Sequence, residues 1–148
     1  DHDSGYSKQQ STRPQTLGYG LADSPIGQAA WILEKFYQWM DCDGHPENVA
    51  SRDELLDNVM MYWLPDAGAS SARIYWESFG NTNLDVIELP VGCTLFPKEI
   101  FKTSERWARA RFTNLIHFEV MEKGGHFAAF EQPQALVDQI QRCFRQLR

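Results

Sequence analysis

The chain has 148 residues, of which 43% are hydrophobic and 13% aromatic, and this is enough for an ordinary globular core. The formal net charge is −6 and the basic residues are scattered, so we expect no nucleic-acid partner. No apolar run reaches the roughly eighteen residues that a membrane helix needs, so no membrane-spanning segment is expected within this sequence. The N-terminus lacks both a basic start and an apolar stretch, which argues against a signal peptide.

Three cysteines, Cys42, Cys93 and Cys143, are far apart in the sequence and form no C-x-x-C pair. Their odd number and wide spacing favour neither a disulfide framework nor a zinc site, so we expect a reducing compartment such as the cytoplasm. No cofactor or metal is expected. The sequence begins without Met, and we interpret it as a piece of a longer protein, which leaves open a membrane anchor carried upstream.

The first helix signal is the tripeptide Asp23-Ser24-Pro25, in which Asp23 is expected to cap a helix that starts at Pro25. Residues 26–39 are apolar nearly all round, which predicts a buried helix. A polar loop with Gly and Pro is expected over 41–50.

Two further helices are predicted before residue 80. Ser51 and Glu54 fit a capping box at the start of a helix that Pro65 ends. Another helix is expected from Ser70 or Ser71 to about Phe79. Residues 1–80 are therefore predicted to be helical.

The second half alternates strands and helices. Expected in order are a strand over 84–93, a helix over 104–111 with Trp107 inward, a strand over 115–121, a turn at Gly124-Gly125-His126, and a helix over 132–147 whose inward residues are Ala135, Leu136, Val137, Ile140 and Phe144. This alternation predicts an α/β fold with parallel strands. Because two strands alone do not make a stable covered sheet, residues 81–148 should complete a larger one.

His126 is the strongest catalytic candidate from residue chemistry alone. It follows two glycines beyond the carboxyl end of a predicted strand, where catalytic loops gather in α/β sheets. The alternative is a solvated histidine in a turn. His2, His45 and His117 have weaker cases, because they lie near a chain end, in a polar loop and within a strand.

A catalytic histidine needs an acid that fixes its tautomer, and Glu99 follows the other predicted strand. Neighbouring parallel strands bring both loops to one edge of the sheet, so a contact between Glu99 and His126 is expected. The alternative for Glu99 is a surface carboxylate paired with Lys98 or Lys102. Tyr6 and Tyr75 carry no signal of their own, because tyrosines in helices are usually core residues.

Several segments, in order, resemble the microsomal-type epoxide hydrolase family. They are Ser4-Gly5-Tyr6, 10–27, 30–36, 58–63, 73–77 (RIYWE), 89–92 (LPVG), 96–99 (FPKE) and 124–131 (GGHFAAFE). Together they cover nearly the whole chain. The resemblance implies the C-terminal portion of an α/β-hydrolase fold, with 1–80 as part of a helical cap and 81–148 as part of the core.

The resemblance also implies a reaction and a set of site residues. In the family an aspartate opens an epoxide to a covalent ester, and water activated by a His–acid pair hydrolyses the ester to a vicinal diol. Carried over by position, Tyr6 and Tyr75 would donate hydrogen bonds to the epoxide oxygen, His126 would be the general base and Glu99 its acid partner. The implied partners are a small apolar epoxide, water and the N-terminal half of the same fold, and a homo-oligomer is left open.

Two elements of the family pattern are absent, namely the Gly-Gly-Asp-Trp-like elbow that carries the nucleophile and the His-Gly-Trp-Pro-like loop that helps line the oxyanion side. We therefore expect this chain alone to be incomplete and inactive. Two alternatives stay open. One is another α/β-hydrolase that acts on esters or haloalkanes, although the two tyrosines speak against a halide site. The other is a non-catalytic homologue that binds apolar ligands.

Overall fold

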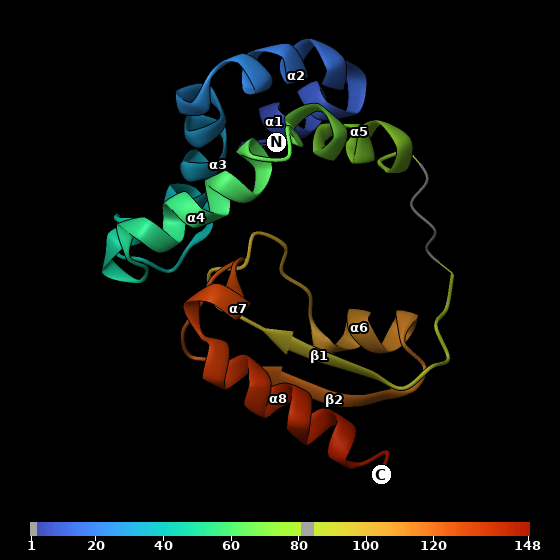
Figure 1. Cartoon of the computed structure of the whole chain (residues 1–148). Helices are drawn as coiled ribbons and strands as arrows, with labels where there is room; N and C mark the ends of the chain where they lie inside the picture. The colour runs from blue at the N-terminus through green and yellow to red at the C-terminus, as the bar shows by residue number, and fades with distance from the viewer. Residues whose placement is uncertain (1–2, 81–84) are drawn as a thin grey trace. The chain divides into compact units, whose positions relative to one another are not determined.

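The computed structural model describes residues 3–80 and 85–148, and the chain divides into two compact units. Unit 1 comprises Asp1–Lys35 and Ser51–Asn83, and unit 2 comprises Phe36–Ala50 and Leu84–Arg148. Helix α3 (Pro25–Trp39) carries the chain from the first unit into the second (Figure 1). His2, one of the weaker catalytic candidates, and Leu84, the expected start of the first strand, lie outside the described residues.

Unit 1 is built from helices. They are α1 (Gly5–Thr12), α2 (Pro14–Asp23), the first part of α3, α4 (Arg52–Trp63) and α5 (Gly68–Ser78). Helix α5 packs against both α1 and α2. At this contact a Cβ on Gly18 would collide with Ala69, and one on Gly68 would lie 2.8 Å from the Cβ of Leu21. Glycine is therefore what lets α2 and α5 approach so closely.

Helices α3 and α4 occur where the sequence predicts them. The capping box is confirmed, since the Ser51 hydroxyl accepts the Glu54 N–H at 3.3 Å and the Glu54 carboxylate accepts the Ser51 N–H at 2.8 Å. The cap expected at Asp23 is wrong. Asp23 ends α2, and the Ser24 hydroxyl accepts the Gly27 N–H at 3.1 Å in its place.

Unit 2 contains the predicted parallel pair, β1 (Val91–Leu95) and β2 (Leu115–Val120). Its helices are η1 (Pro46–Asn48), α6 (Glu105–Arg111), α7 (Ala128–Glu131) and α8 (Pro133–Arg145). In Figure 1, α6 lies above the two strands and α8 below them. Strand β1 begins later than expected, and within residues 85–90 an isolated parallel bridge joins Ile87 to Phe112. Pro90, directly before the strand, has no N–H for the ladder.

Parallel pairing continues beyond the ends of the two strands. The Met121 N–H donates to the Leu95 carbonyl at 2.8 Å, and the Lys98 N–H donates to the Gly124 carbonyl at 3.0 Å. Lys98 and Gly125 form an isolated parallel bridge. The loops after β1 and β2 are thus held together by backbone hydrogen bonds.

Several expected core positions are exposed in unit 2. Trp107 is 69% exposed, and the residue of α6 that is buried is Ala108. On α8, Val137, Ile140 and Phe144 are also exposed, because the helix presents Gln139 and Cys143 to the strands. Gln139 Oε1 accepts a hydrogen bond from His117 Nε2, and a Cβ on Gly92 of β1 would lie 2.5 Å from the Cys143 sulfur.

The sequence predicts a domain boundary between residues 80 and 81. One of the points at which the chain passes from unit 1 to unit 2 lies close to it in the sequence. The segment Phe36–Ala50, however, groups with unit 2, because Trp39 and Asp41 bind the loop around His126. The assignment of residues 1–80 to a cap stays a prediction.

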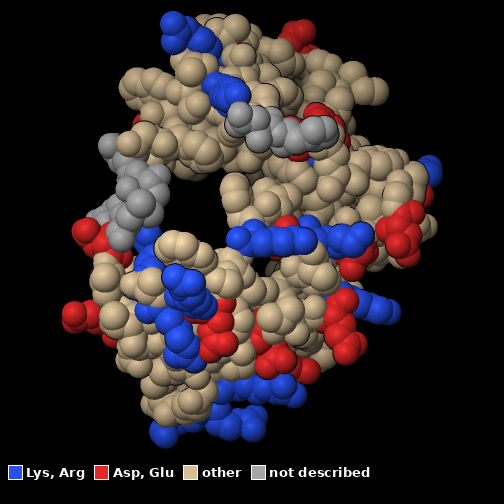
Figure 2. Space-filling view, turned by 180° about the vertical axis from the view of Figure 1, so that it is seen from behind, with Lys and Arg blue, Asp and Glu red and all other residues tan. Residues whose placement is uncertain are grey.

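Within the described ranges, no helix combines the length and apolar character needed to cross a membrane. Figure 2 shows acidic and basic side chains intermixed on the face seen from behind.

Candidate active site

Glu99 and His126 lie directly beyond the paired ends of β1 and β2. Glu99 directly follows Lys98, and His126 directly follows Gly125. Because Lys98 and Gly125 form a parallel bridge, the register sets Glu99 and His126 side by side. Glu99 is fixed by its N–H, which donates to the Phe96 carbonyl at 3.1 Å. The carboxyl ends of neighbouring parallel strands are where ligands collect in α/β sheets.

The side chains of Glu99 and His126 are in direct contact. His126 Nδ1 lies 2.7 Å from Glu99 Oε1, which also accepts the Ile100 N–H at 2.7 Å. Because a carboxylate offers no hydrogen, Nδ1 donates in this pair. In the neutral imidazole, Nε2 is then left with a lone pair that can take a proton.

Aromatic rings surround the His126 imidazole on two sides. The Trp39 and Phe127 rings each meet it edge to face, with centroids 5.2 Å away. The His126 side chain is still 33% exposed and that of Glu99 27%. This environment positions the ring while leaving part of it accessible within the described chain.

Tyr6 of α1 and Tyr75 of α5 form a second pair, in unit 1. Their ring centroids are 5.8 Å apart at an interplanar angle of 77°. The contact arises because α1 packs on α5. Tyr75 is further fixed by stacking on Phe79 at 4.6 Å.

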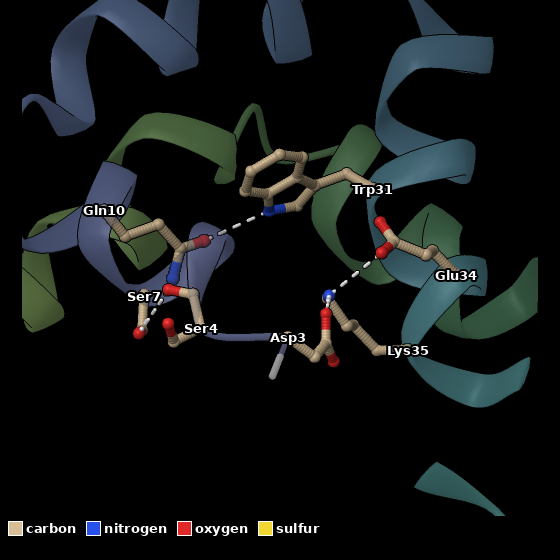
Figure 3. Close-up of polar contacts among 7 residues, drawn as sticks. All are labelled: Asp3, Ser4, Ser7, Gln10, Trp31, Glu34 and Lys35. Atoms are coloured by element: carbon tan, nitrogen blue, oxygen red, sulfur yellow. Dashed lines mark hydrogen bonds and ion pairs between the residues drawn. The ribbon is translucent and has the colours of Figure 1, made fainter. Parts of the chain in front are cut away.

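Lys35 and its two carboxylate partners, drawn in Figure 3, form a polar network that lies beside Tyr6. The Lys35 ammonium is 4.8 Å from the centroid of the Tyr6 ring and is paired with Asp3 at 2.7 Å and Glu34 at 3.1 Å. Burial alone would lower the pKa of Lys35, but its hydrogen bonds to these carboxylates outweigh that effect and raise the pKa. Lys35 thus stays charged over the aromatic ring.

The same corner of unit 1 is braced by an indole. The Trp31 Nε1–H donates to the Gln10 side-chain oxygen at 3.1 Å, which ties α1 to α3 (Figure 3). Gln10 is buried, so this bond satisfies an amide that would otherwise be costly.

Tyr6 is expected to remain protonated far into the alkaline range. Burial, followed by the neighbouring Tyr75 and then Asp3, raises its pKa from 10.0 to about 12. In a spectrophotometric titration of tyrosinate, the difference between the wild-type chain and Tyr6→Phe should appear only near pH 12. The pKa of Tyr6 is higher in the folded than in the unfolded state. The contribution of the protonated phenol to the free energy of unfolding is therefore full below about pH 10 and is lost as the pH rises toward 12. A difference signal centred at pH 10 would contradict this.

The structure thus brings together Glu99 with His126 in unit 2, and Tyr6 with Tyr75 in unit 1. The weaker histidines have other partners. His45 Nε2 lies 2.7 Å from the Tyr37 hydroxyl, and His117 Nε2 lies 2.8 Å from Gln139 Oε1. Among the described residues, no cluster of three His, Cys, Asp or Glu side chains suits a metal ion.

Residue-by-residue reasoning missed two charged groups close to these pairs. Lys35 lies beside Glu34 on α3, and Glu131 is a buried carboxylate on α7. For Glu131 a signal was available in the sequence, since a lone charge after the apolar residues 127–130 has to find partners if it is buried. Asp41 was assigned to a polar loop, but its carboxylate accepts the Gly124 N–H at 3.0 Å.

Comparison with known proteins gives a consistent set of relatives. No protein-family model matches the chain. It is 55% identical over 148 residues to a putative epoxide hydrolase of Stigmatella aurantiaca and 40% identical over 152 residues to epoxide hydrolase 1 of Sus scrofa. These matches cover 99% and 95% of the chain but 34% of each relative, so the chain spans about a third of their length.

Solved structures give the same result for the fold. Juvenile hormone epoxide hydrolase from the silkworm Bombyx mori superposes with a TM-score of 0.89 at 31% identity, over 97% of this chain and 40% of that one. The Aspergillus niger epoxide hydrolase superposes with a TM-score of 0.85 at 33% identity, over 97% of this chain and 36% of that one. The helices and the short parallel sheet are therefore part of an α/β-hydrolase fold.

Proposed function

This chain belongs by sequence and fold to the epoxide hydrolases of the α/β-hydrolase fold, and from that premise we propose that it supplies part of an active site that converts epoxides to vicinal diols. The proposed catalytic residues are His126, Glu99, Tyr6 and Tyr75. The observation that carries the proposal is the 2.7 Å contact between His126 Nδ1 and Glu99 Oε1. This contact leaves the opposite ring nitrogen ready to act as a base.

The hydrolytic step uses the histidine pair. A covalent ester between the enzyme and the opened epoxide is attacked at its carbonyl carbon by water, whose proton passes to His126 Nε2. Glu99 stabilises the imidazolium that forms and keeps Nδ1 as the donor. Collapse of the tetrahedral intermediate then breaks the ester bond, and the leaving alkoxide takes the proton from the His126 imidazolium, which gives the diol. The carboxylic acid left on the enzyme loses its proton to solvent, which restores the carboxylate.

The ring-opening step uses the two phenols. A carboxylate attacks one epoxide carbon, the carbon–oxygen bond breaks, and negative charge develops on the departing oxygen. Hydrogen bonds from Tyr6 and Tyr75 stabilise that oxygen, which then takes up a proton from solvent. A donor must keep its proton, and burial, which raises the pKa of Tyr6 to about 12, extends the protonated state of this phenol into the alkaline range.

The attacking carboxylate is proposed to come from the rest of the fold, as in the family's Gly-Gly-Asp elbow. Exposed apolar side chains on α8, among them Val137, Ile140 and Phe144, are consistent with a surface that this remaining part covers. Within the described residues the sheet has two strands, fewer than a stable covered sheet needs. The chain is accordingly proposed to be the C-terminal part of the hydrolase, and a homo-oligomer stays open.

The expected substrates are small apolar epoxides. A histidine–acid pair would equally serve an esterase, so it is the pair of phenols that favours epoxides over esters or haloalkanes.

The three cysteines are free thiols, and burial, then the neighbouring Cys143, raises the pKa of Cys93. Such thiols fit a reducing compartment, and we propose the cytoplasm.

The test is to express the complete reading frame that contains this chain and to incubate the protein with styrene oxide. We expect formation of the vicinal diol, measured by chromatography, and an upstream Gly-Gly-Asp elbow in the sequence. A p-nitrophenyl ester and a bromoalkane serve as comparison substrates. Hydrolysis of the ester without diol formation, together with a serine in the elbow, would support an esterase and refute the proposal.

A further inference from the structure

The carboxylate of Glu131 is buried beside the loop that carries His126. Its residue is 7% exposed, although glutamate is rarely buried without partners. One oxygen, Oε2, accepts the N–H groups of Asp41 at 2.7 Å and Gly125 at 2.8 Å. The other, Oε1, accepts the Phe127 N–H at 2.9 Å. Glu131 therefore binds the backbone on both sides of His126.

The remaining amides of the loop are held as firmly. The His126 N–H donates to the Trp39 carbonyl at 2.9 Å, and the Gly124 N–H donates to Asp41 Oδ2 at 3.0 Å. Four consecutive N–H groups, from Gly124 to Phe127, are thus each bound by a specific acceptor. The acceptors come from the end of α3, the residue Asp41 and Glu131.

The fit around this loop leaves no room for adjustment. A Cβ on Gly125 would collide with the Trp39 carbonyl and would lie 2.9 Å from the Asp41 nitrogen and 3.0 Å from Glu131 Oε1. Gly124 has a φ of +112°, which side-chain-bearing residues rarely adopt. Hydrogen bonds to a carboxylate are among the strongest in proteins, so the three that Glu131 accepts contribute to holding this loop in place.

We propose that Glu131 is a positioning residue for His126, whose carboxylate fixes the two peptide groups that flank the histidine and so aims the imidazole at the ester carbonyl. Glu99 binds the ring itself, whereas Glu131 acts through the backbone. The role rests on the proposed function, because it is the hydrolytic step that needs His126 as a base. Misplacing such a base by about 1 Å costs on the order of 100-fold in rate.

The test is Glu131→Gln in the protein encoded by the complete reading frame. The amide nitrogen of glutamine cannot accept an N–H, so the loop loses at least one of its three carboxylate bonds. We expect hydrolysis of the covalent ester to slow by roughly 10- to 100-fold. Ring opening, measured by rapid quench, should stay within about twofold, because its attacking carboxylate and phenols do not depend on this loop.

This difference gives a signature in steady-state kinetics. When only the second step slows, kcat and KM fall together and kcat/KM is preserved, because kcat/KM is set before the ester breaks down. A general loss of structure would lower kcat/KM as well. The matched control is Glu122→Gln, which removes the same charge at an exposed position two residues before Gly124 and should leave both constants unchanged.

If Glu131→Gln does not fold, Glu131→Asp keeps the charge but shortens the side chain by one methylene, and the same fall of kcat with KM is expected on a smaller scale. The inference is overturned if kcat/KM falls in step with kcat, or if kcat does not change in the folded variant. Failure of the proposed function is a distinct result, in which the wild-type protein forms neither ester nor diol from an epoxide.

Discussion

His126→Ala is expected to stop turnover while still allowing the ester to form. Ring opening needs the attacking carboxylate and the phenols, whereas ester hydrolysis needs the base at His126 Nε2. Removing a general base costs on the order of 10²- to 10⁴-fold in rate. The enzyme should therefore accumulate as a one-to-one covalent adduct, which intact-protein mass spectrometry detects as the added mass of the epoxide.

A matched control for this variant is His45→Ala. His45 is exposed in unit 2 and its imidazole contacts Tyr37, far in sequence from the loop at His126. This variant should turn over at the wild-type rate without accumulating adduct. Unchanged diol formation by His126→Ala would disprove the proposed mechanism.

The double variant Tyr6→Phe with Tyr75→Phe is expected to slow ring opening by on the order of 10³-fold. Both hydroxyls that stabilise the departing oxygen are removed, while the rings that pack α1 against α5 remain. Each single variant should lose less, because the other phenol still donates. Single-turnover measurement of ester formation separates this effect from the hydrolytic step.

Tyr19→Phe is the control for the loss of a phenol. Tyr19 lies on α2 in the same unit and is 70% exposed. It should form the ester at the wild-type rate. Ester formation at that rate by the double variant would show that the tyrosines do not stabilise the departing oxygen.

The contact between Glu99 and His126 followed from the sequence because it depends on few facts. Two strands had to be parallel and adjacent, and both side chains had to follow the strand ends, which places them at one edge of the sheet. Hydrophobic patterning and glycine placement carry that information locally. The pairing of Tyr6 with Tyr75 required the resemblance to a family, since nothing near Tyr6 predicted a helix.

Helices α1 and α2 could not be predicted from local pattern for a physical reason. Helix α1 is mostly polar, and α2 contains Gly18 and Gly20, which weaken helices by roughly 1 kcal/mol each relative to alanine. Packing on α5 overcomes these local preferences, and at Gly18 the missing side chain is what permits that packing. The prediction that Trp107 and the apolar residues of α8 are buried was wrong for a related reason. Periodicity shows which side chains share a face of a helix but not which neighbours are present to cover that face.

The spacing between Glu99 and His126 is fixed by backbone pairing through Lys98 and Gly125, not by the packing of side chains on the strands. Conservative substitutions on the faces of β1 and β2 therefore leave the distance between the two groups unchanged. Insertion or deletion of a single residue between Leu95 and Glu99 is expected to have the opposite effect, since it changes the length of the connection that brings Lys98 into its bridge with Gly125 and so displaces the carboxylate from the imidazole. Natural and engineered variation in this chain should accordingly tolerate changes of residue type in these strands but not changes of length in the connection after β1.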